Sequence, residues 1–401
     1  MVTEMMAGPV LNPYDYNFHE DPYPVYKRLR DEAPLYRNDE LNFWALSRHA
    51  DVLAGFRDNA RLSNRNGVSL DPAAFGPEAH RIMSFLALDH PRHLRLRTLV
   101  SKGFTPRRIR ELEPRVAELT TQHLDAAMQH EEFDFIAEFA GKLPMDVISE
   151  LMGVPEPDRA EVRKLADDVM HRDEGVNDVS KIAAQASISL ITYYYELIRQ
   201  CRKAPGDNLT SALLDAEVDG DRLTDDEILG FMFLMVIAGN ETTTKLLSNA
   251  VYWAWRYPDE RAKPFSDPAM VPQWAEETLR FDNSSQILAR TVAEDIALYD
   301  RVVPEGDIML LLPGSANRDE RVFPDADVYR IGRDIGTKLM SFGNGVHYCL
   351  GAHLARLEAR VALTALVERV KSYEVDADNA VRVHSSNVRG FVSLPIKVEA
   401  R

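Results

Sequence analysis

The stretch F-G-N-G-V-H-Y-C-L-G, residues 342–351, does most to decide the fold. Its cysteine, Cys349, follows a glycine-rich loop and stands at the expected start of a helix over residues 350–370. The amino end of a helix offers free amide donors and the positive end of the dipole, which favour a thiolate. Gly343 and Gly351 permit close approaches that a side chain would block. The loop suits an anionic sulfur held against a flat cofactor, although a lone cysteine is more often simply buried.

The cysteines and the amino-terminal sequence indicate a cytoplasmic protein. Cys349 and Cys201 are the only cysteines among 401 residues, so a disulfide framework is excluded and a reducing compartment fits. Cys201 lies in the polar run R-Q-C-R-K and is interpreted as a surface thiol. The first ten residues lack the basic and apolar parts of a signal peptide. No apolar run approaches the roughly 20 residues needed to span a bilayer, so we expect no membrane span.

The composition is that of a globular protein, with 45% hydrophobic and 27% charged residues. The formal net charge of −16 argues against a nucleic-acid-binding face, since phosphate binding needs a basic surface. Such acidity favours a monomer, because like charges repel. Neither an internal repeat nor a flexible linker is visible, so residues 1–401 are predicted to form a single domain.

Periodicity predicts many helices with small sheets at the periphery. Apolar residues recur at three- and four-residue spacing in four early segments, which are therefore expected to be helices: 23–32, 106–128, 137–152 and 180–203. Residues 61–89 and 166–179 are expected to be irregular, and so is the proline- and aspartate-rich stretch 317–334. Short strands are expected within 285–313 and in the carboxyl-terminal tail.

The longest expected helix begins at Thr224, where T-D-D-E forms a capping box with Glu227. Its apolar pattern continues through Trp255, and its middle is apolar on every side, so we expect it to be buried. A glycine and several threonines follow in A-G-N-E-T-T, residues 238–243. Because a threonine hydroxyl competes for backbone carbonyls, this segment predicts a bulge in the helix.

The stretch 342–351 resembles the heme-binding loop of the cytochrome P450 family, F-G-x-G-x-H-x-C-x-G, with each fixed position filled. The resemblance implies a mainly α, triangular-prism fold with small peripheral β-sheets, and heme b (iron protoporphyrin IX) as cofactor. It implies that Cys349 is the axial iron ligand, that Phe342 packs beside the sulfur and that His347 donates to a heme propionate. It also places Gly343 and Gly351 among the cofactor-binding residues. An axial thiolate pushes electron density onto iron and favours O–O cleavage.

Two further motifs follow the family pattern around the cofactor. In D-H-P-R-H-L-R-L-R, His93 and Arg97 lie four residues apart on one helix face, and the resemblance directs both to the heme carboxylates. Arg290, in L-A-R-T, is placed as another propionate partner, since its apolar neighbours make an unpaired charge costly. A bare His-x-x-x-Arg pattern would usually be a surface pair.

The segment E-E-T-L-R contains the E-x-x-R pair Glu277 and Arg280, which share a helix face. An isolated pair of this kind is usually a solvated surface pair of little energetic value. In the family, the pair instead anchors the chain behind the heme loop. Arg333, in Y-R-I-G-R, is the candidate third member, although Val328 stands where an arginine is commoner.

The segment A-G-N-E-T-T resembles the oxygen-activation sequence of the family, A-G-x-(D/E)-T. The resemblance makes Thr242 and Glu241 the catalytic residues: Thr242 hydrogen-bonds the oxygen being activated, and Glu241 relays protons as a general acid. Asn240 stands where an apolar residue or histidine is commoner, and its role is left open. The structural alternative is a glycine packing contact beside a buried, paired glutamate.

The implied function is that of a heme-thiolate monooxygenase of the soluble, ferredoxin-dependent bacterial type. It inserts one oxygen atom from O2 into an apolar substrate, for which we expect a lipid, terpenoid, steroid or polyketide-like molecule. Electrons come from a ferredoxin and its reductase, steered by a local basic patch: Lys102, Arg107, Arg108, Arg110 and Arg356. Substrate choice is assigned to the segments that match the family least: 69–88, 166–191, 236–237, 285–288 and 387–391.

Two other functions remain open from the sequence. A peroxide-driven peroxygenase would use the same heme but would lack the acid–alcohol pair, so Glu241 and Thr242 count against it. A non-catalytic heme sensor or carrier would not need A-G-N-E-T-T. Turnover with peroxide but not with a ferredoxin system would favour the peroxygenase, and no oxygen consumption coupled to product would favour the sensor.

Overall fold

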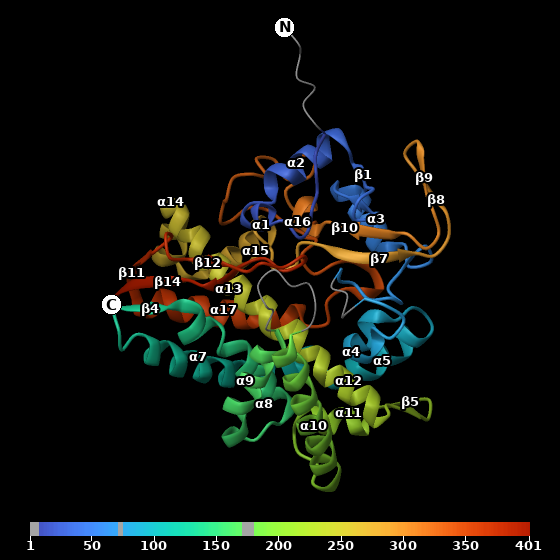
Figure 1. The fold of residues 1–401 in the computed structure, drawn as a ribbon. Coiled ribbons are helices and arrows are strands. Elements are labelled where there is room, and N and C mark those ends of the chain that lie inside the picture. The colour runs from blue at the N-terminus through green and yellow to red at the C-terminus, as the bar shows by residue number, and fades with distance from the viewer. Residues whose placement is uncertain (1–7, 71–74, 171–179) are drawn as a thin grey trace.

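A computed structural model describes residues 8–70, 75–170 and 180–401. Within these ranges the chain is mainly helical, with small sheets that have helices on both sides (Figure 1). The α-helices are α1 (Tyr16–Glu20), α2 (Tyr23–Glu32), α3 (His49–Arg57), α4 (His80–Met83), α5 (Arg92–Gly103), α6 (Pro106–Glu111), α7 (Glu113–Ala127), α8 (Leu143–Met152), α9 (Arg159–Met170), α10 (Lys181–Lys203), α11 (Leu209–Asp215), α12 (Asp225–Met235), α13 (Glu241–Arg256), α14 (Pro258–Ser266), α15 (Val271–Phe281), α16 (Pro313–Ala316) and α17 (Ala352–Arg369).

The larger sheet has five strands in the order β1-β2-β10-β7-β3. Its strands are β1 (Leu35–Asn38), β2 (Phe43–Leu46), β10 (Ile308–Leu311), β7 (Leu288–Val292) and β3 (Leu62–Ser63). β10 is parallel to β2 and antiparallel to β7, and this pairing places Met309 opposite Arg290. A three-stranded sheet, β11 (Val370–Val375), β14 (Pro395–Ala400) and β4 (Glu132–Asp134), lies near α14 (Figure 1). The remaining strands pair in twos: β5 (Glu217–Val218) with β6 (Asp221–Arg222), β8 (Ile296–Leu298) with β9 (Arg301–Val303), and β12 (Val381–Arg382) with β13 (Phe391–Ser393).

The helices α13 and α17 run through the middle of the molecule. The helices α7 to α11 lie on one side of them, and the five-stranded sheet lies on the other side with α1, α2, α3 and α16 (Figure 1). One extended apolar cluster joins residues of α5, α7, α8, α10, α12, α13, α15 and α17. Two smaller clusters pack against the two faces of the five-stranded sheet. The two central helices are therefore anchored by the largest core, which gives the residues on them fixed positions.

Several sequence expectations on local structure need correction. The segment 106–128 forms two helices, α6 and α7, and the segment 137–152 begins with a π-helical turn, Ile136–Ala140, before α8. Residues 166–170 belong to α9 and are not irregular, whereas the rest of that segment, 171–179, lies outside the described residues. Cys201 is buried, with its Sγ 3.9 Å from Oδ1 of Asn208, and is not a surface thiol, because the apolar face of α10 includes it. In the described ranges, no helix combines the length and apolar content of a bilayer span.

The carboxyl group of Glu358, on α17, is buried inside the helical core. The residue is 2% exposed, and its Oε2 meets no hydrogen-bond partner among the described residues. Burial raises the pKa of Glu358 well above its usual range. The folded protein therefore keeps this proton at pH values where the unfolded chain has released it, so the free energy of unfolding falls as pH rises above the unfolded pKa.

We therefore expect Glu358→Gln to stabilise the protein at pH 7–8, by at least about 1.4 kcal/mol, the equivalent of one pKa unit. The advantage should shrink as pH falls toward about 4, where both states of the wild type are protonated. Urea unfolding of the holoprotein at several pH values measures this. Glu368→Gln, on the exposed face of the same helix, is the matched control and should change little. A Glu358→Gln variant less stable than wild type at pH 8 would contradict the expectation.

Candidate active site

The long helix expected from Thr224 is present but interrupted. Thr224 and Glu227 form the expected capping box at the start of α12. A π-helical turn, Val236–Asn240, separates α12 from α13. The hydroxyl of Thr242 donates to the carbonyl of Ala238 at 2.7 Å, as a threonine does when it competes for backbone acceptors. The expected bulge is confirmed, and π turns of this kind often lie at functional sites.

The bulge opens onto a cavity of about 1780 Å³. Glu241 and Thr242 line it, and a close packing contact lies beside them, since a Cβ added to Gly239 would be 2.8 Å from Cδ1 of Ile148. The cavity residues that fall in the segments assigned to substrate choice are Ser69, Arg81, Ile82, Met83, Leu86, Asp167, Asp168, Val169, Ser187, Ile191, Ile237, Ser285, Leu288, Asn387 and Val388. Other residues of those segments, such as Val236 and Phe85, are buried in the core.

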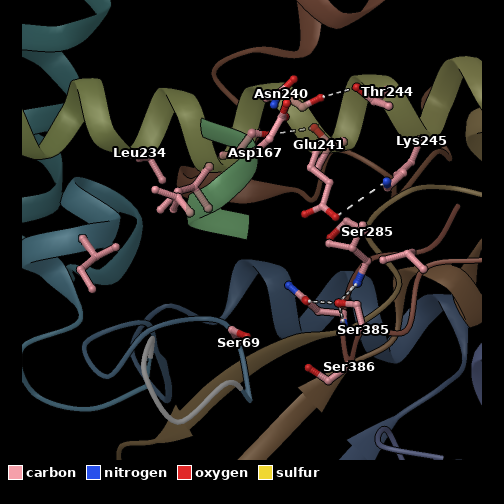
Figure 2. A pocket seen from close by; sticks show the side chains of 18 of the residues that line it. Ser69, Asp167, Leu234, Asn240, Glu241, Thr244, Lys245, Ser285, Ser385 and Ser386 are labelled. Carbon is pink, nitrogen blue, oxygen red and sulfur yellow. Dashed lines mark hydrogen bonds and ion pairs between the residues drawn. The ribbon is translucent and has the colours of Figure 1, made fainter. Parts of the chain in front are cut away.

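Three polar residues beside the bulge line the cavity together, which the sequence did not indicate: Asp167, Asn240 and Lys245. Asn240 is 6% exposed, and its side chain hydrogen-bonds the carboxyl group of Asp167 on α9. Burial raises the pKa of Asp167, whereas Arg163 and Asn240 lower it. Lys245, one turn beyond Glu241, also lines the cavity (Figure 2). A lysine within an otherwise buried helix segment was the available sequence signal.

Four basic side chains that the resemblance assigns to the heme carboxylates are brought together. The rings of His93 and His347 lie 4.0 Å apart between centroids, and Arg97 donates to the carbonyl of Tyr348 at 2.6 Å. Burial, together with charge repulsion from His93, Arg290 and Arg97, lowers the pKa of His347 to about 2. These side chains come from α5, β7 and the cysteine loop, which are far apart in the sequence.

No carboxylate forms an ion pair with this cluster in the described part of the chain. Arg290 is 4% exposed, and its one hydrogen bond there goes to the carbonyl of Ala289 at 2.7 Å. Burial lowers the pKa of Arg290 to about 10, and the carboxylate of Asp89 opposes that shift. Within the same ranges, Nε2 of His93 and Nδ1 of His347 are buried without hydrogen-bond partners. Buried cations and donors of this kind require an anionic ligand, and a pair of heme carboxylates fits them.

The cysteine loop has the backbone geometry expected from its glycines. Gly343 and Gly345 have φ values of 67° and 70°, a region that favours glycine. The amide of Cys349 donates to the carbonyl of Phe342 at 2.9 Å, which closes the loop. The helix α17 begins at Ala352, two residues later than expected, with Gly351 at its cap. A Cβ on Gly351 would lie 3.9 Å from Sγ of Cys349, in ordinary van der Waals contact with the sulfur.

The thiol of Cys349 is exposed on one side and surrounded by protein on the others. Burial raises its pKa, and the amides of Gly351 and Ala352 and the guanidinium groups of Arg97 and Arg356 act in the opposite direction. The amides and cations expected to favour a thiolate are therefore present, but burial outweighs them. A bound metal cation would supply the missing stabilisation, because a coordinating thiol loses its proton.

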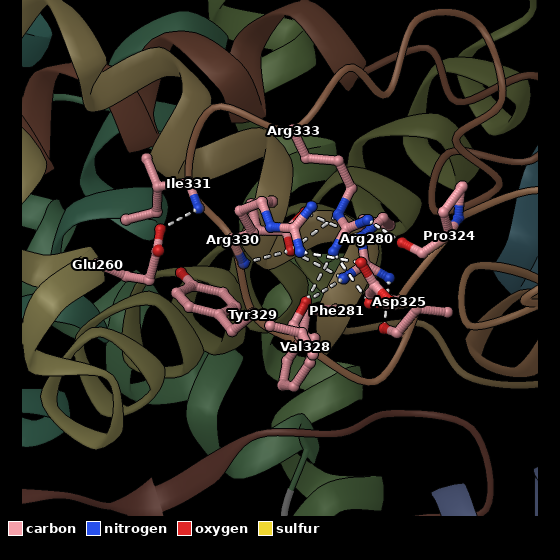
Figure 3. Close-up of polar contacts among 12 residues, drawn as sticks. Glu260, Arg280, Phe281, Pro324, Asp325, Val328, Tyr329, Arg330, Ile331 and Arg333 are labelled. Atoms are coloured by element: carbon pink, nitrogen blue, oxygen red, sulfur yellow. Dashed lines mark hydrogen bonds and ion pairs between the residues drawn. The ribbon is translucent and has the colours of Figure 1, made fainter.

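Behind the loop, Glu277 and Arg280 form a fully buried pair. Arg280 donates from Nε and Nη2 to the two carboxylate oxygens of Glu277, each at 2.8 Å, and both side chains are 0% exposed. Nε of Arg333 lies 3.4 Å from Oε1 of Glu277, and the amide of Arg330 donates to the same oxygen at 2.8 Å. Figure 3 shows Arg333 and Arg280 side by side over Val328. The proposed third member, Arg333, is confirmed in this network, and the surface-pair alternative is wrong.

The same network fixes the irregular segment before the cysteine loop. Nη1 of Arg280 donates to the carbonyls of Asn317 and Ala326, at 3.0 and 2.9 Å. The side chain of Asn317 in turn donates to Oγ of Ser341 at 2.8 Å. A chain of hydrogen bonds thus connects the buried ion pair with the residue before Phe342. The segment 317–334 is irregular, as expected, and these bonds replace secondary structure in holding it.

Comparison with known proteins identifies the class to which this fold and site belong. A family model described as cytochrome P450 matches residues 269–399. The solved structure of CYP109Q5 from Chondromyces apiculatus shares 32% sequence identity and a TM-score of 0.89, over 98% of this chain and 100% of that one. CYP109E1 from Bacillus megaterium, in complex with corticosterone, shares 30% identity and a TM-score of 0.85, over 95% and 99%. The chain belongs to the cytochrome P450 family.

A mycobacterial relative is closer in sequence. The chain is 69% identical to the putative cytochrome P450 123 of Mycobacterium bovis over 392 residues, which cover 98% of each chain. The protein is therefore a heme monooxygenase with heme b as cofactor, and the expected P450 fold is confirmed.

Proposed function

We propose that Cys349 is the axial ligand of the heme iron and that the heme carboxylates bind among His93, Arg97, Arg290 and His347. The observation that carries this proposal is the cluster of buried, unneutralised basic groups at one side of the cysteine loop. When bound, the heme supplies the iron at which dioxygen is reduced and one oxygen atom is transferred. Phe342, Gly343 and Gly351 give the loop the shape that admits it. The whole chain works as one domain in this proposal.

Glu241 and Thr242 manage protons at the bulge in this proposal. The hydroxyl of Thr242 donates to the carbonyl of Ala238, one helical turn earlier. The carbonyl of Thr242 accepts a hydrogen bond from Oγ of Ser284 at 2.7 Å. Both bonds fix Thr242 at the cavity wall. Because its hydroxyl carries a single proton, the hydroxyl would leave the Ala238 carbonyl in order to donate to the oxygen being reduced. Glu241, also on the wall, brings protons from the solvent side. This pair favours a monooxygenase that uses dioxygen over a peroxide-driven enzyme or a heme sensor.

Replacing Thr242 by alanine should divert reducing equivalents into hydrogen peroxide. Without the hydroxyl, protons reach the oxygen less selectively, so we expect product per NADPH to fall about tenfold or more, toward the 10²–10⁴ that a positioned proton donor contributes. Peroxide and product are measured against NADPH oxidised. Thr192→Ala is the matched control, because Thr192 also donates to a carbonyl one turn back, at 2.8 Å, but lies on the exposed face of α10. Unchanged coupling in the alanine variant would remove Thr242 from the mechanism.

The proposed substrates are apolar molecules of lipid, terpenoid, steroid or polyketide-like class. The cavity volume accommodates a molecule of this size, since ligand pockets usually measure about 300–1,000 Å³. Ile82, Met83 and Leu86 provide an apolar wall, and methionine adapts to different shapes. The structure of CYP109E1 with corticosterone supports the steroid class. The test is a titration of the ferric protein with a panel of these compounds, read as a shift of the Soret band.

The proposed electron donors are a ferredoxin and its reductase. Arg107 and Arg110 are exposed on α6, and Arg356, on α17, is 3.3 Å from the hydroxyl of Tyr348 beside the cysteine. Such a basic patch would steer an acidic ferredoxin despite the overall negative charge. We further propose a monomer in the cytoplasm. Turnover supported by ferredoxin, reductase and NADPH tests the proposed electron donors, and turnover supported by peroxide alone would favour the peroxygenase.

A further inference from the structure

A lysine that the proposed chemistry does not use lies one helical turn beyond Glu241. Lys245 and Glu241 share a face of α13 as an i,i+4 pair, with Nζ 3.9 Å from Oε1, and the lysine side chain is 8% exposed. Nζ also donates to the carbonyl of Phe391 at 2.9 Å. Figure 2 shows the Glu241 side chain extending away from the helix, with its carboxylate joined to this ammonium group by a dashed line.

The aliphatic part of Lys245 has little room to move. The backbone of Gly390 packs directly against this side chain. A Cβ on Gly390 would lie 2.6 Å from Cβ of Lys245 and 2.8 Å from its Cδ. The backbone of Gly390 has a φ of 159°, so both the space and the conformation favour glycine there. The ammonium group is therefore held at one point, by packing along the stem and by the Phe391 carbonyl at its tip.

The carboxylate of Glu241 has few other restraints. Its side chain is 16% exposed at the cavity wall, and Lys245 is the one basic group within 4.0 Å of it in the described ranges. Glutamate has several rotatable bonds, so a carboxylate without such a partner samples many directions. A fixed cation selects one of them.

The surroundings of Lys245 act on its charge in opposite directions. Burial lowers the pKa of Lys245, and Glu241 and Asp167 oppose that shift. Asp167 comes from α9, beside Arg163, which itself donates to both carboxylate oxygens of Asp146 at 2.7 Å. A buried ammonium is destabilising unless it is paired, and a structural contact to Phe391 alone could be made by a neutral donor. In the described ranges, Glu241 is the carboxylate that lies within 4.0 Å of this ammonium group.

We propose that Lys245 is a positioning residue that fixes the direction of the Glu241 carboxylate and so sets its delivery of protons beside Thr242. The inference rests on the role proposed above for Glu241. Nζ of Lys245 also donates to the carbonyl of Phe391, and the next residue, Val392, lines the cavity. Lys245 therefore contacts both Glu241 and the chain segment at Phe391 and Val392. Movement of that segment upon substrate binding would then change the position of the proton donor.

The test compares Lys245→Met, Glu241→Gln and the double variant with wild-type holoenzyme. Methionine keeps an unbranched apolar stem and removes the charge. Lys164→Met is the matched control, since Lys164 forms an i,i+4 pair with Asp168 but is 66% exposed. The first readout is peroxide released per NADPH, with ferredoxin, its reductase and the steroid that gives the largest Soret shift. The second is the coupling between positions 241 and 245 in a double-mutant cycle of urea unfolding of the ferric protein.

We expect Lys245→Met to raise the peroxide fraction at least about threefold, a small part of what a positioned acid contributes. The double variant should be no worse than Glu241→Gln alone, and the unfolding cycle should show at least about fivefold coupling, as residues in contact do. Glu241→Asp, which keeps an acid but cannot reach Lys245, provides a second route and should raise the peroxide fraction as well.

The inference is overturned if Glu241→Gln raises the peroxide fraction while Lys245→Met and Glu241→Asp leave it at the wild-type value. Additive effects of the two single substitutions on unfolding would also overturn it. If Glu241→Gln itself leaves the peroxide fraction unchanged, the role proposed for Glu241 is wrong and this inference falls with it. The two failures are therefore distinguishable.

Discussion

Replacing Cys349 by alanine should abolish monooxygenase turnover, with a loss of at least about 10³-fold, as when a central member of a catalytic unit is removed. The proposed site has one sulfur ligand, and alanine offers no donor atom in its place. The electron density that an axial thiolate pushes onto iron would be lost, and O–O cleavage with it. Oxygen consumption coupled to product and the carbonyl spectrum of the reduced protein measure the effect.

The chain provides its own control for this substitution. Cys201→Ala removes the other cysteine, which is buried in α10 with Asn208 as a neighbour of its sulfur. This variant should keep the thiolate-type carbonyl spectrum and close to wild-type turnover, with only the modest stability loss of a small core substitution. A Cys349→Ala protein that kept the wild-type spectrum would show that another residue binds the iron.

Replacing Glu277 by glutamine should destabilise the protein by about 3–5 kcal/mol, the usual cost of leaving a buried charge without its partner. Arg280 is 0% exposed, and a neutral amide cannot neutralise it or accept at both positions. The single oxygen of the amide can accept either from Arg333 and the amide of Arg330 or from Nε of Arg280, but not from both sides. Because this network fixes the segment before the cysteine loop, we also expect a smaller fraction of the purified protein to contain heme.

Urea unfolding measures the loss of stability in Glu277→Gln, and the heme-to-protein ratio measures the loss of heme. Glu196→Gln is the matched control: Glu196 and Arg199 also form an i,i+3 pair, but both are about half exposed, at 52% and 55%. Exposed pairs contribute about 0–1 kcal/mol, so this variant should behave as wild type. Equal stabilities of the two variants would mean that the buried pair does not hold the fold.

The sequence predicts the helix bulge and the Glu277–Arg280 pair better than their surroundings, and the reason is physical. Cys349, Thr242 and the Glu277–Arg280 pair lie in short motifs whose function depends on local backbone geometry, so their spacing carries the information. The helix bulge followed from the order of glycine and threonines, and the structure confirms it. The contact of Arg333 with Glu277 is harder to predict from the sequence, because it depends on an irregular segment that is folded by long-range hydrogen bonds.

Tertiary packing accounts for what the sequence misses. Lys245 has no motif of its own, and its role depends on Gly390, which is distant in the chain. Cys201 stands in a polar run, yet the packing of α10 buries it. The cavity wall also includes Tyr14 and Tyr16 near the amino terminus, outside each segment assigned to substrate choice. Periodicity within one segment does not show which distant segment will cover it.

The central claim, that the sulfur of Cys349 binds the heme iron, is tested most directly by X-ray absorption at the iron edge of the purified protein. We predict one sulfur atom in the first coordination shell of iron, beside the four ring nitrogens, in the wild type and in Cys201→Ala. The sulfur should be absent in Cys349→Ala. A wild-type shell of nitrogen and oxygen atoms alone would contradict the account.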